Sequence, residues 1–427
     1  MPKRLLIIES NTTGTGLLTL EKALAAGLSP LFLTNNPRRY QGLELIQCPV
    51  IVCDTNSVDA LRQTIASHIE AEQILGITTT SEFYLETVAW LTSSYGLPGN
   101  APEAIAVCRN KASTRQALAV AKIPQPAFAI IRSLDELREV LAQMQLPYVV
   151  KPADDTGSNE VRLCKTVDEV KAQTARIFAL QTNVRGQQTA QTVLLEEFLD
   201  APEFSVEMFS WRGTATCIGI TQKHLTKLPY FVEQRHIFPA VLSQQTAEIV
   251  QETVRHALEV VGVTHGATHT EVKLTPRGVA IIEINARLAG GMIPELIRYA
   301  TGIDLVEQQI NAVVGTPLDL SSRRTGYAGI QFLLAHQEGW LKGIQGIETI
   351  QREIAGIEQV TVTALTGKRV APPRSAYDRL GYVIAQGDTY GKVVQRLDQA
   401  LTTLAVLVGP DVSDGIDKDE TDEGRSR

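Results

Sequence analysis

Residues 3–79 alternate short apolar segments with amphipathic ones, and this alternation restricts the fold more than any other feature of the chain. The opening segment KRLLIIE is typical of a strand, and LLTLEKALAAGL, after a Thr/Gly-rich loop, is typical of a helix. Two more β segments follow, then the helical pattern SVDALRQTIASHIEAE and the strand-like ILGIT. Strands that alternate with helices predict a parallel sheet covered by helices, so we expect an N-terminal α/β domain over residues 1–97.

The loop NTTGTG connects the first predicted strand to the first predicted helix. It does not match the GxGxxG pattern of dinucleotide-binding loops, and no ribose-binding acid follows it. We therefore expect no dinucleotide site here. The loop instead predicts a turn at the carboxyl end of the strand, the edge at which open α/β sheets bind ligands.

Gly and Pro residues divide the rest of the chain into further regions. The segment YGLPGNAPEA precedes a core that we place at residues 98–318, with one lobe at about 124–200. A smaller C-terminal α/β domain is expected at residues 319–408, and it ends in the helical pattern GKVVQRLDQALTTLAVL. The charged segment that follows predicts a disordered acidic tail over residues 409–427.

Composition and charge exclude several classes of function. The net charge of −7 and the acidic pI give no general nucleic-acid footprint. The cysteines are scattered and odd in number, which argues against a disulfide framework and fits a reducing cytoplasm. No stretch approaches the roughly 18 apolar residues of a membrane span, and the apolar run after MPKR is too short for a signal peptide. We expect a cytoplasmic protein without nucleic-acid or membrane partners.

The segment GVAIIEINARLAGG places polar residues at every second position of an apolar strand. Because side chains alternate across a strand, Glu283, Asn285 and Arg287 are expected on one face, while Ile282 and Ile284 point to the other. The three could form a solvated face, which is common in half-buried antiparallel strands. They could equally supply two metal ligands and an anion clamp.

A hairpin about TPRG brings a second carboxylate to this face. If opposed residues have numbers that sum to 554, Glu271 lies opposite Glu283. Two carboxylates so close repel unless a cation lies between them, and hard cations such as Mg²⁺ take oxygen ligands, to which Asn285 adds one. Alternatively, Lys273, opposite Ile281, neutralises the pair without any metal.

Two lysines stand at the ends of separate elements. Lys111 opens a helix in CRNKASTR, and Lys151 closes the apolar strand YVVK just before a loop that contains Gly157 and Ser158. A single lysine is usually a solvated surface group. A flexible loop with free backbone N–H groups and hydroxyls can instead cradle phosphate oxygens, although this one does not match the Walker A pattern.

The segment LLEEFLDAPEFSVEMF places acids on both sides of a short apolar linker. Glu196 and Glu197 end one predicted strand, Phe198 and Leu199 follow, and Glu203 begins the next strand. An apolar linker with exposed backbone groups suits the edge of an adenine ring, and a flanking acid suits ribose hydroxyls. In isolation, an ordinary acidic turn explains the segment better.

In this order, NKASTR, VVKP, LEEFLDAPEFSVE, TEVKL and AIIEINARLAGG resemble the motifs of the ATP-grasp superfamily of carboxylate–amine ligases. The resemblance covers residues 1–405 and includes the entry segment GITTTSEFYLETVAWL. Within the superfamily the chain is most similar to the dipeptide-forming L-amino acid ligases, on the segments ATHTEVKL, NARLAGGMIPELI and PYFVEQRHIFPA. The resemblance implies an ATP-grasp fold with a Rossmann-like N-terminal domain.

The resemblance also implies roles for individual residues. Lys111 and Lys151 would contact the ATP phosphates, and Lys151 would also assist catalysis. The loop Asp155–Asn159, with Asp155, Gly157 and Ser158, would be the mobile lid. The remaining nucleotide-binding residues would be Glu196 with the backbone of Glu197, Phe198 and Leu199 for adenine, and Glu203 for ribose. Glu271, Glu283 and Asn285 would bind Mg²⁺, or Mn²⁺ in its place.

The implied reaction converts a carboxylate to an acyl phosphate and joins it to an amine, with release of ADP and phosphate, and a homodimer is allowed. Arg287 would hold the acyl phosphate, unless it forms only a structural salt bridge to Glu295 on the following helix. Gly290 and Gly291 would let a substrate approach the backbone. The remaining substrate-side residues would be Glu233 and His236, although His236 could be a structural histidine.

Two other functions share parts of this pattern. The lid ADDTGSNEV lacks the run of glycines typical of biotin carboxylase, which weakens a carboxylase function, whereas the purine-biosynthetic members stay open. The alternative of another class is a nucleotide-binding regulatory protein without turnover. Such a protein has no chemical need for both lysines and both metal carboxylates, so we favour an enzyme.

Overall fold

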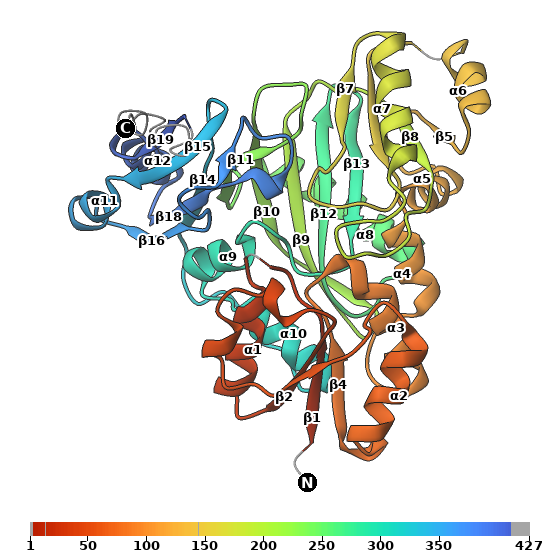
Figure 1. The fold of residues 1–427 in the computed structure, drawn as a ribbon, viewed down its shortest axis with the longest axis vertical. Coiled ribbons are helices and arrows are strands. Elements are labelled where there is room, and N and C mark those ends of the chain that lie inside the picture. The colour runs from red at the N-terminus through yellow and green to blue at the C-terminus, as the bar shows by residue number, and fades with distance from the viewer. Residues whose placement is uncertain (1–2, 13, 144, 411–427) are drawn as a thin grey trace, which may run out of the picture.

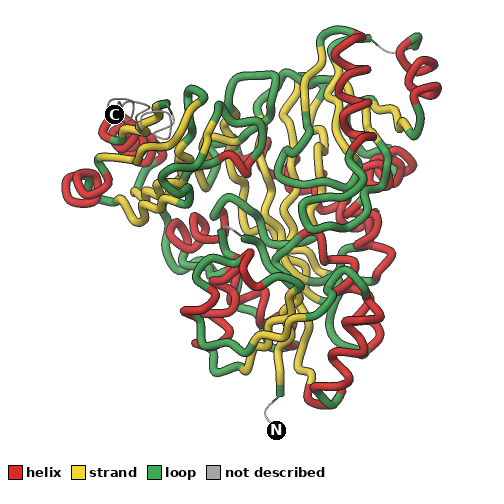
Figure 2. The backbone as a smooth tube through the Cα atoms, viewed as in Figure 1, coloured by secondary structure: helices red, strands yellow, loops and turns green. Residues whose placement is uncertain are grey.

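The computed structural model describes residues 3–12, 14–143 and 145–410, so the predicted tail lies outside the described residues from position 411 onward. Its predicted start at residue 409 was wrong, because Gly409 ends strand β19, Ala405–Gly409, and pairs with Trp340. The N-terminal sheet lies at the bottom of Figure 1, and a long central sheet rises from it. A small lobe covers one upper side of the central sheet and the C-terminal region lies on the other side, as the tube in Figure 2 also shows.

The N-terminal region contains the predicted parallel sheet, with strand order β3-β2-β1-β4. Leu6 and Ile8 of β1 pack into one apolar cluster and Leu5 and Ile7 into another, as expected for a parallel strand covered on both faces. The strands are β1 Arg4–Ile8, β2 Ser29–Thr34, β3 Val50–Val52 and β4 Ile74–Thr78; the helices are α1 Gly16–Ala25, α2 Val58–His68 and α3 Leu85–Ser94.

A four-stranded antiparallel sheet with strand order β5-β8-β6-β7 forms the small lobe. Two helices lead into it and two more pack against it. The helices are α4 Pro102–Arg109, α5 Lys111–Val120, α6 Leu134–Leu141 and α7 Val167–Ala179; the strands are β5 Phe128–Ile131, β6 Tyr148–Pro152, β7 Arg162–Cys164 and β8 Val193–Glu197.

An antiparallel eight-stranded sheet forms the centre of the molecule, with strand order β13-β12-β9-β10-β11-β14-β18-β16. Its last three strands come from the C-terminal region, and β14 pairs directly with β11. Helix α8, Gln244–Val261, packs against the strands at the β13 end. The strands are β9 Glu203–Trp211, β10 Thr214–Leu225, β11 Glu233–Phe238, β12 Gly266–Thr275, β13 Gly278–Asn285, β14 Tyr327–Leu333, β16 Ile357–Val362 and β18 Gly381–Gly387.

Helices α9, Ile293–Thr301, and α10, Leu305–Val314, connect the central sheet to the N-terminal one, because Ile297 and Ile310 share a core with β1 and β14. The other C-terminal elements are α11 Ile347–Glu353, α12 Tyr390–Thr403, and the three-stranded sheet β17 Arg369–Val370, β15 Gly339–Gln345 and β19 Ala405–Gly409. The predicted last helix was too long: it ends at Thr403, and the β-branched and apolar residues after it pair with β15.

The β12–β13 hairpin has the predicted register at its functional end and a different one nearer its turn. Glu271 lies opposite Glu283, as predicted. A bulge then shifts the pairing by one residue, so Lys273 lies opposite Ala280. The prediction that Lys273 faces Ile281 was therefore wrong.

The same bulge changes the direction of one side chain. Ile282 is the extra residue and borders the central cavity, although strict alternation predicted that it points away. Ile284 points into the apolar core as predicted. The guanidinium of Arg115 donates to the carbonyls of Ile281 at 3.2 Å and Ile282 at 2.6 Å, so a side chain from α5 stabilises the bulge.

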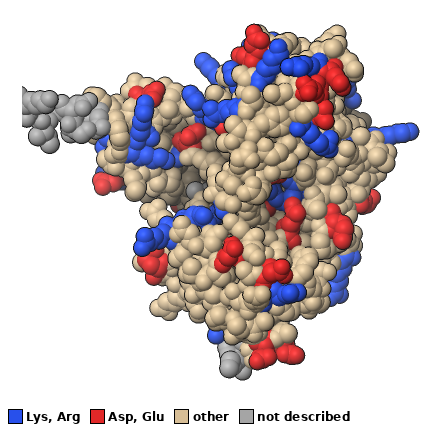
Figure 3. All heavy atoms as spheres, turned by 45° about the vertical axis from the view of Figure 1, so that its right-hand side comes forward, with Lys and Arg blue, Asp and Glu red and all other residues tan. Residues whose placement is uncertain are grey.

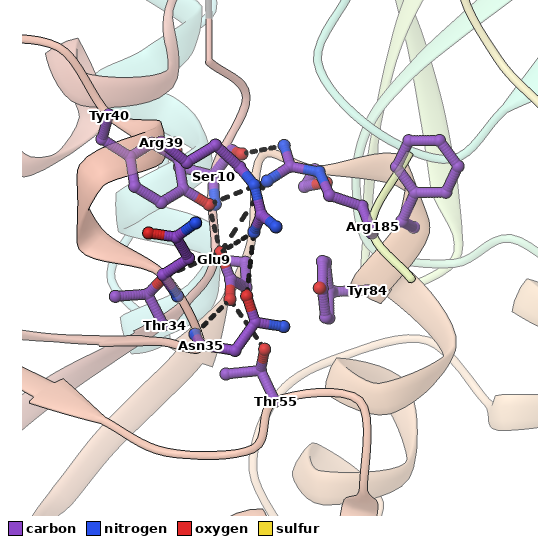
Figure 4. Close-up of polar contacts among 12 residues, drawn as sticks. Glu9, Ser10, Thr34, Asn35, Arg39, Tyr40, Thr55, Tyr84 and Arg185 are labelled. Atoms are coloured by element: carbon purple, nitrogen blue, oxygen red, sulfur yellow. Dashed lines mark hydrogen bonds and ion pairs between the residues drawn. The ribbon is translucent and has the colours of Figure 1, made fainter. Parts of the chain in front are cut away.

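The small lobe is attached to the N-terminal sheet through a cluster around Glu9, the residue directly after β1 (Figure 4). Arg185 reaches this cluster from the loop between α7 and β8, and donates to the Ser10 carbonyl at 2.8 Å and the Tyr40 hydroxyl at 3.2 Å. The Asn56 amide donates to the Arg185 carbonyl at 3.0 Å. These contacts fix the position of one edge of the small lobe.

Within the described ranges, the helices are all too short or too polar to cross a lipid bilayer.

Candidate active site

One cavity of about 710 Å³ lies between the small lobe, the central sheet and the C-terminal region, and every predicted site residue lines it. Figure 3 shows the surface hollowed beside the C-terminal region, with basic and acidic side chains around the hollow. The lining residues predicted from the sequence are Lys111, Lys151, Asp155, Gly157, Ser158, Glu196, Glu197, Phe198, Leu199, Glu203, Glu233, His236, Glu271, Glu283, Asn285, Arg287, Gly290 and Gly291.

At one end of the cavity, Glu196 is buried between two cations. Lys151 Nζ lies 2.8 Å from Glu196 Oε2, and Arg115 Nε lies 2.7 Å from Glu196 Oε1. Burial disfavours the charged carboxylate, but the two cations outweigh burial and lower the pKa of Glu196 to about 2. Burial also lowers the pKa of Lys151, against the opposing effect of Glu196. Lys151 is therefore held in a fixed position at the cavity wall.

Lys111 connects the lid to the hairpin. It begins α5, whose cap is the Asn110 side chain, and its Nζ donates to the Asp155 carbonyl at 2.6 Å. The same Nζ lies 3.3 Å from Glu283 Oε1. Burial opposes the charge of Lys111, but Glu283 and Glu82 outweigh it and raise the pKa of the lysine. Lys111 is therefore a cation placed beside both a lid residue and a predicted metal ligand.

Lys223 of β10 is a further buried cation, and it was not predicted from the sequence. Its Nζ lies 2.6 Å from Glu271, 2.9 Å from Glu203 and 3.3 Å from Glu233. Burial opposes its charge, but these carboxylates raise the pKa of Lys223 well above its usual value. A lysine in an alternating strand looks like a solvated residue until the neighbouring strands are known. The Lys223 ammonium thus pairs with acids predicted for the ribose, metal and substrate subsites.

Behind Glu271 lies a histidine that was also missed. His269 Nδ1 is 3.0 Å from Glu207 Oε2, and its Nε2 is 3.4 Å from Glu271 Oε1. Burial disfavours the imidazolium, but Glu207 and Glu271 together raise the pKa of His269 to about 9. The charged ring bridges the two carboxylates and orients Glu271.

The predicted metal ligands present suitable chemistry. Glu271 and Glu283 face each other on the cavity side of the hairpin, with Asn285 beside them, and oxygen donors of this kind suit a hard divalent cation. Within the described ranges no group of three or more His, Cys, Asp or Glu residues is arranged to hold a metal. Lys111 is the cation next to Glu283, and Lys223 and His269 lie next to Glu271.

Glu82, from the segment TTTSEFYLE, is the partner of Arg287. Its Oε2 accepts from Arg287 Nε at 3.1 Å and from the Thr156 hydroxyl at 2.8 Å, and its Oε1 accepts from Arg109 at 2.6 Å. The amide nitrogen of Asn285, assigned from the hydrogen-bond network, lies 3.1 Å from this carboxylate. Burial opposes ionisation, but Arg287 and Arg109 hold the pKa of Glu82 well below its usual range.

The alternative partner suggested for Arg287 was wrong. Glu295 pairs with Arg298, three residues further along α9, at 2.6 Å. Helical spacing favours that local pair. Arg287 therefore points into the cavity toward the N-terminal region rather than onto the following helix.

The substrate-side residues gather around Gly291. His236 is buried, its ring packs edge-on against Phe332 at 5.5 Å, and burial lowers the pKa of His236 to about 3. A Cβ on Gly291 would lie 2.9 Å from His236 Nε2, and φ is +58° there, so glycine is required on two grounds. Glu233 pairs with Arg379 at 2.6 Å, a residue of the C-terminal region that was not predicted.

The predicted adenine-binding segment lies at the cavity edge. The N–H of Glu197 is already used, since it donates to the Ala127 carbonyl at 2.8 Å, and its side chain pairs with Arg277 at 2.6 Å. The Phe198 ring centroid lies 5.9 Å from Lys273 Nζ and 6.2 Å from the ring of Phe231. Phe198 and Phe231 therefore form an aromatic part of the cavity wall, and Leu199 lines the cavity beside them.

Comparison with known proteins identifies the family. Residues 144–295 match the family described as ATP-grasp domain, and residues 331–409 match L-amino acid ligase C-terminal domain 2. The uncharacterized protein y4rH of Sinorhizobium fredii is 30% identical over 410 residues, which cover 96% of this chain and 84% of that protein. The chain belongs to the ATP-grasp superfamily of carboxylate–amine ligases.

Other members of the superfamily support the predicted fold. Alanine–anticapsin ligase of Bacillus subtilis is 28% identical over 248 residues. The match covers 54% of this chain and only about half, 52%, of alanine–anticapsin ligase. The structure of an L-amino acid ligase from Bacillus licheniformis superposes with a TM-score of 0.80 at 22% identity, over 95% of this chain and 99% of that chain. The predicted ATP-grasp fold is confirmed.

Proposed function

We propose that this ligase activates the carboxylate of an amino acid as an acyl phosphate, at the expense of ATP, and joins it to the amine of a second amino acid. The products are an amide or dipeptide, ADP and phosphate. The observation that carries the proposal is the composition of one cavity wall: two lysines from separate elements, two facing carboxylates and a guanidinium.

At the nucleotide end, Lys111 and Lys151 bind the phosphates, and the lid covers them. Glu196 holds Lys151 in place, and Glu203 accepts hydrogen bonds from the ribose. Lysines neutralise the charge that spreads over the phosphoryl oxygens during transfer, and their fixed positions reduce the reorganisation that the reaction requires. The backbone of Phe198 and Leu199 binds the base.

A divalent metal is proposed next to the phosphates. Glu271, Glu283 and Asn285 would hold Mg²⁺, and the bound ion would supply charge stabilisation at the phosphoryl group. His269 and Lys223 orient Glu271 from behind. Lys111 Nζ is paired with Glu283 in this structure. When ATP binds, the ammonium group would bind a phosphate oxygen in place of this carboxylate.

At the substrate end, Arg287 binds the acyl phosphate through its planar fork and stabilises the oxyanion that forms when the amine attacks. To do so, the guanidinium turns part of its fork from Glu82 to the substrate. His236 stays neutral at physiological pH, because its pKa is about 3, so it does not repel an incoming ammonium group. Glu233 attracts that group, and Gly290 and Gly291 leave room for it.

The cytoplasm is the proposed compartment. All five cysteines are unpaired, and burial raises the pKa of each thiol, so they are unreactive structural residues rather than a disulfide framework. A homodimer stays a prediction.

The direct test is a phosphate-release screen over pairs of amino acids with ATP and Mg²⁺, followed by mass analysis of the products. We expect ADP and phosphate release that depends on both amino acids, and a product whose mass equals their sum less one water. Release of phosphate without any condensed product, for every pair tested, would contradict the proposal. Nucleotide binding without turnover would support a regulatory protein instead.

A further inference from the structure

The lid is contacted by a short turn of the C-terminal region. This turn is η5, Ala376–Asp378, in the loop between β17 and β18. The N–H of Ala376 donates to the Gly157 carbonyl at 3.0 Å. The ring of Tyr377 lies against Gly157, since a Cβ built on that glycine would be 3.5 Å from Tyr377 Cε2. Two segments far apart in sequence thus meet at the cavity wall.

The turn has hydrogen bonds of its own, in addition to its contact with the lid. Its cap is Ser375, whose hydroxyl accepts from the Tyr377 N–H at 3.3 Å, and Asp378 accepts from the N–H groups of Arg374 and Ser375, each at 2.9 Å. Strand β18 follows shortly after and pairs with β14 in the central sheet. The turn is therefore a fixed support, and the lid is the element that binds to it.

The opposite side of the lid faces the reacting groups. The Thr156 hydroxyl donates to Glu82, the partner of Arg287, at 2.8 Å. Lys111 Nζ holds the Asp155 carbonyl at 2.6 Å. Ala376 and Tyr377 line the same cavity as these residues. The lid loop thus contacts both the reacting groups and the C-terminal turn.

We propose that the turn Ala376–Asp378 is a latch that keeps the lid closed over the acyl phosphate, with Ala376 and Tyr377 as positioning residues. The inference rests on the proposed function. With the latch open, water reaches the acyl phosphate and attacks its carbonyl carbon. The bond from that carbon to the phosphate oxygen breaks, and the original acid and phosphate are released without an amide. The latch therefore determines the fraction of the consumed ATP that leads to amide formation.

Two variants remove the latch in different ways. Ala376→Pro deletes only the N–H that binds Gly157, because the first position of a helical turn accepts proline and the preceding Ser375 is already extended, with φ −149° and ψ 171°. Tyr377→Ala removes the ring. Leu365→Ala is the matched control, since Leu365 is 70% exposed in the C-terminal region and does not line the cavity.

The first measurement is amide hydrogen exchange of residues 155–159 in the full chain without nucleotide. We expect exchange to be about threefold to tenfold faster in both latch variants, the equivalent of one hydrogen bond, and unchanged in the control. Unchanged lid exchange in both variants, at unchanged melting temperature, would overturn the latch. This measurement needs no substrate, so it decides the latch even where the screen for amide formation fails.

The second measurement is the ratio of amide formed to phosphate released, with a substrate pair that the wild type condenses. We expect this ratio to fall about threefold to tenfold in the latch variants, while phosphate release continues. A loss of both activities in equal proportion would assign the turn a purely structural role and overturn the proposal.

Discussion

Two buried carboxylates at the same edge of the N-terminal sheet have opposite surroundings. Glu9 follows β1 and accepts from the Asn35 N–H and the Thr55 hydroxyl, both at 2.7 Å, and from the Thr34 hydroxyl at 3.0 Å (Figure 4). Its nearest guanidinium, that of Arg39, is 3.6 Å away. Glu82, beyond the end of β4, is held instead by the guanidiniums of other elements and by a lid hydroxyl.

The difference distinguishes a carboxylate that stabilises the fold, Glu9, from one that positions the proposed reacting groups, Glu82. The hydrogen bonds to Glu9 come mainly from neutral groups that do not line the cavity, so they can stay in place throughout a reaction. The partners of Glu82 include Arg287 and Thr156, which belong to the proposed clamp and lid. Glu82 positions the groups that pair with it. It must also release them when they bind the substrate, so its hydrogen bonds are not kept throughout the reaction.

The largest expected effect is that of Arg287→Lys. A lysine keeps the charge beside Glu82 but cannot reproduce the two parallel hydrogen bonds of the fork. We expect amide formation to fall by about 100- to 1000-fold, the range for loss of an oxyanion-stabilising group, with nucleotide affinity retained. Calorimetric titration with ADP and a product assay on one variant check this. A destabilised but fully active variant would make the Arg287–Glu82 pair purely structural.

Glu82→Gln comes next. The amide keeps the shape but leaves Arg287 and Arg109 without their counter-charge, so both guanidiniums lose their fixed orientation. We expect kcat/KM for amide formation to fall by about 10- to 100-fold, less than for the loss of the clamp itself, because Arg287 is still present. Steady-state kinetics with Glu9→Gln as the matched control measure the effect. Equal losses in both variants would remove the distinction between the two carboxylates.

The next prediction concerns the loss of stability in acid that a carboxylate paired with cations causes. The pKa of Glu196 is about 2 in the folded chain and about 4.3 in an unfolded one, so its ionised form stabilises the fold above pH 4.3. That stabilisation is lost as the pH falls toward 2. Between pH 6 and pH 3 we expect a loss on the order of 2 kcal/mol, which Glu196→Gln should lack. Urea unfolding at the two pH values tests this, and identical pH dependence in both proteins would contradict it.

Glu9→Gln should have the smallest effect, and on stability alone. Glutamine keeps most of the acceptor geometry but removes the charge that faces Arg39 and Arg185. We expect the free energy of unfolding to fall by about 1.5 kcal/mol, with unchanged activity of the folded enzyme. Denaturant unfolding and initial rates at a permissive temperature check both parts. A selective loss of activity would place Glu9 among the functional groups.

The sequence predicted the site where local periodicity governs it. Glu283, Asn285 and Arg287 lie on the cavity side because a strand alternates its side chains, and Glu271 could be placed opposite Glu283 from hairpin geometry. The bulge at Ile282 broke that alternation for one residue. Its cause is tertiary, since the bulge carbonyls are held by a side chain from α5, which local patterns do not report.

The residues that were missed share one property: their role depends on partners from other elements. Lys223 becomes a buried cation only when β9, β11 and β12 come together around it. Glu82 becomes a buried, paired carboxylate only when the hairpin end and α4 approach it. Burial and charge pairing of this kind arise from the assembled fold. The family resemblance supplied the order of the motifs, but not the counter-charges that hold them.

The continuous central sheet has a consequence for attempts to recombine these enzymes. Because β14 pairs along one edge of β11 and β10 along the other, a chain shortened before residue 327 would leave the β14-facing edge of β11 unpaired. An open strand edge favours self-association over a shorter, working ligase. The turn that touches the lid is carried by the same segment. A graft of the C-terminal region from a relative would therefore transfer two interfaces, the β11–β14 pairing and the contact with the lid. Both must fit the rest of this chain before a change in specificity can be attributed to the grafted region.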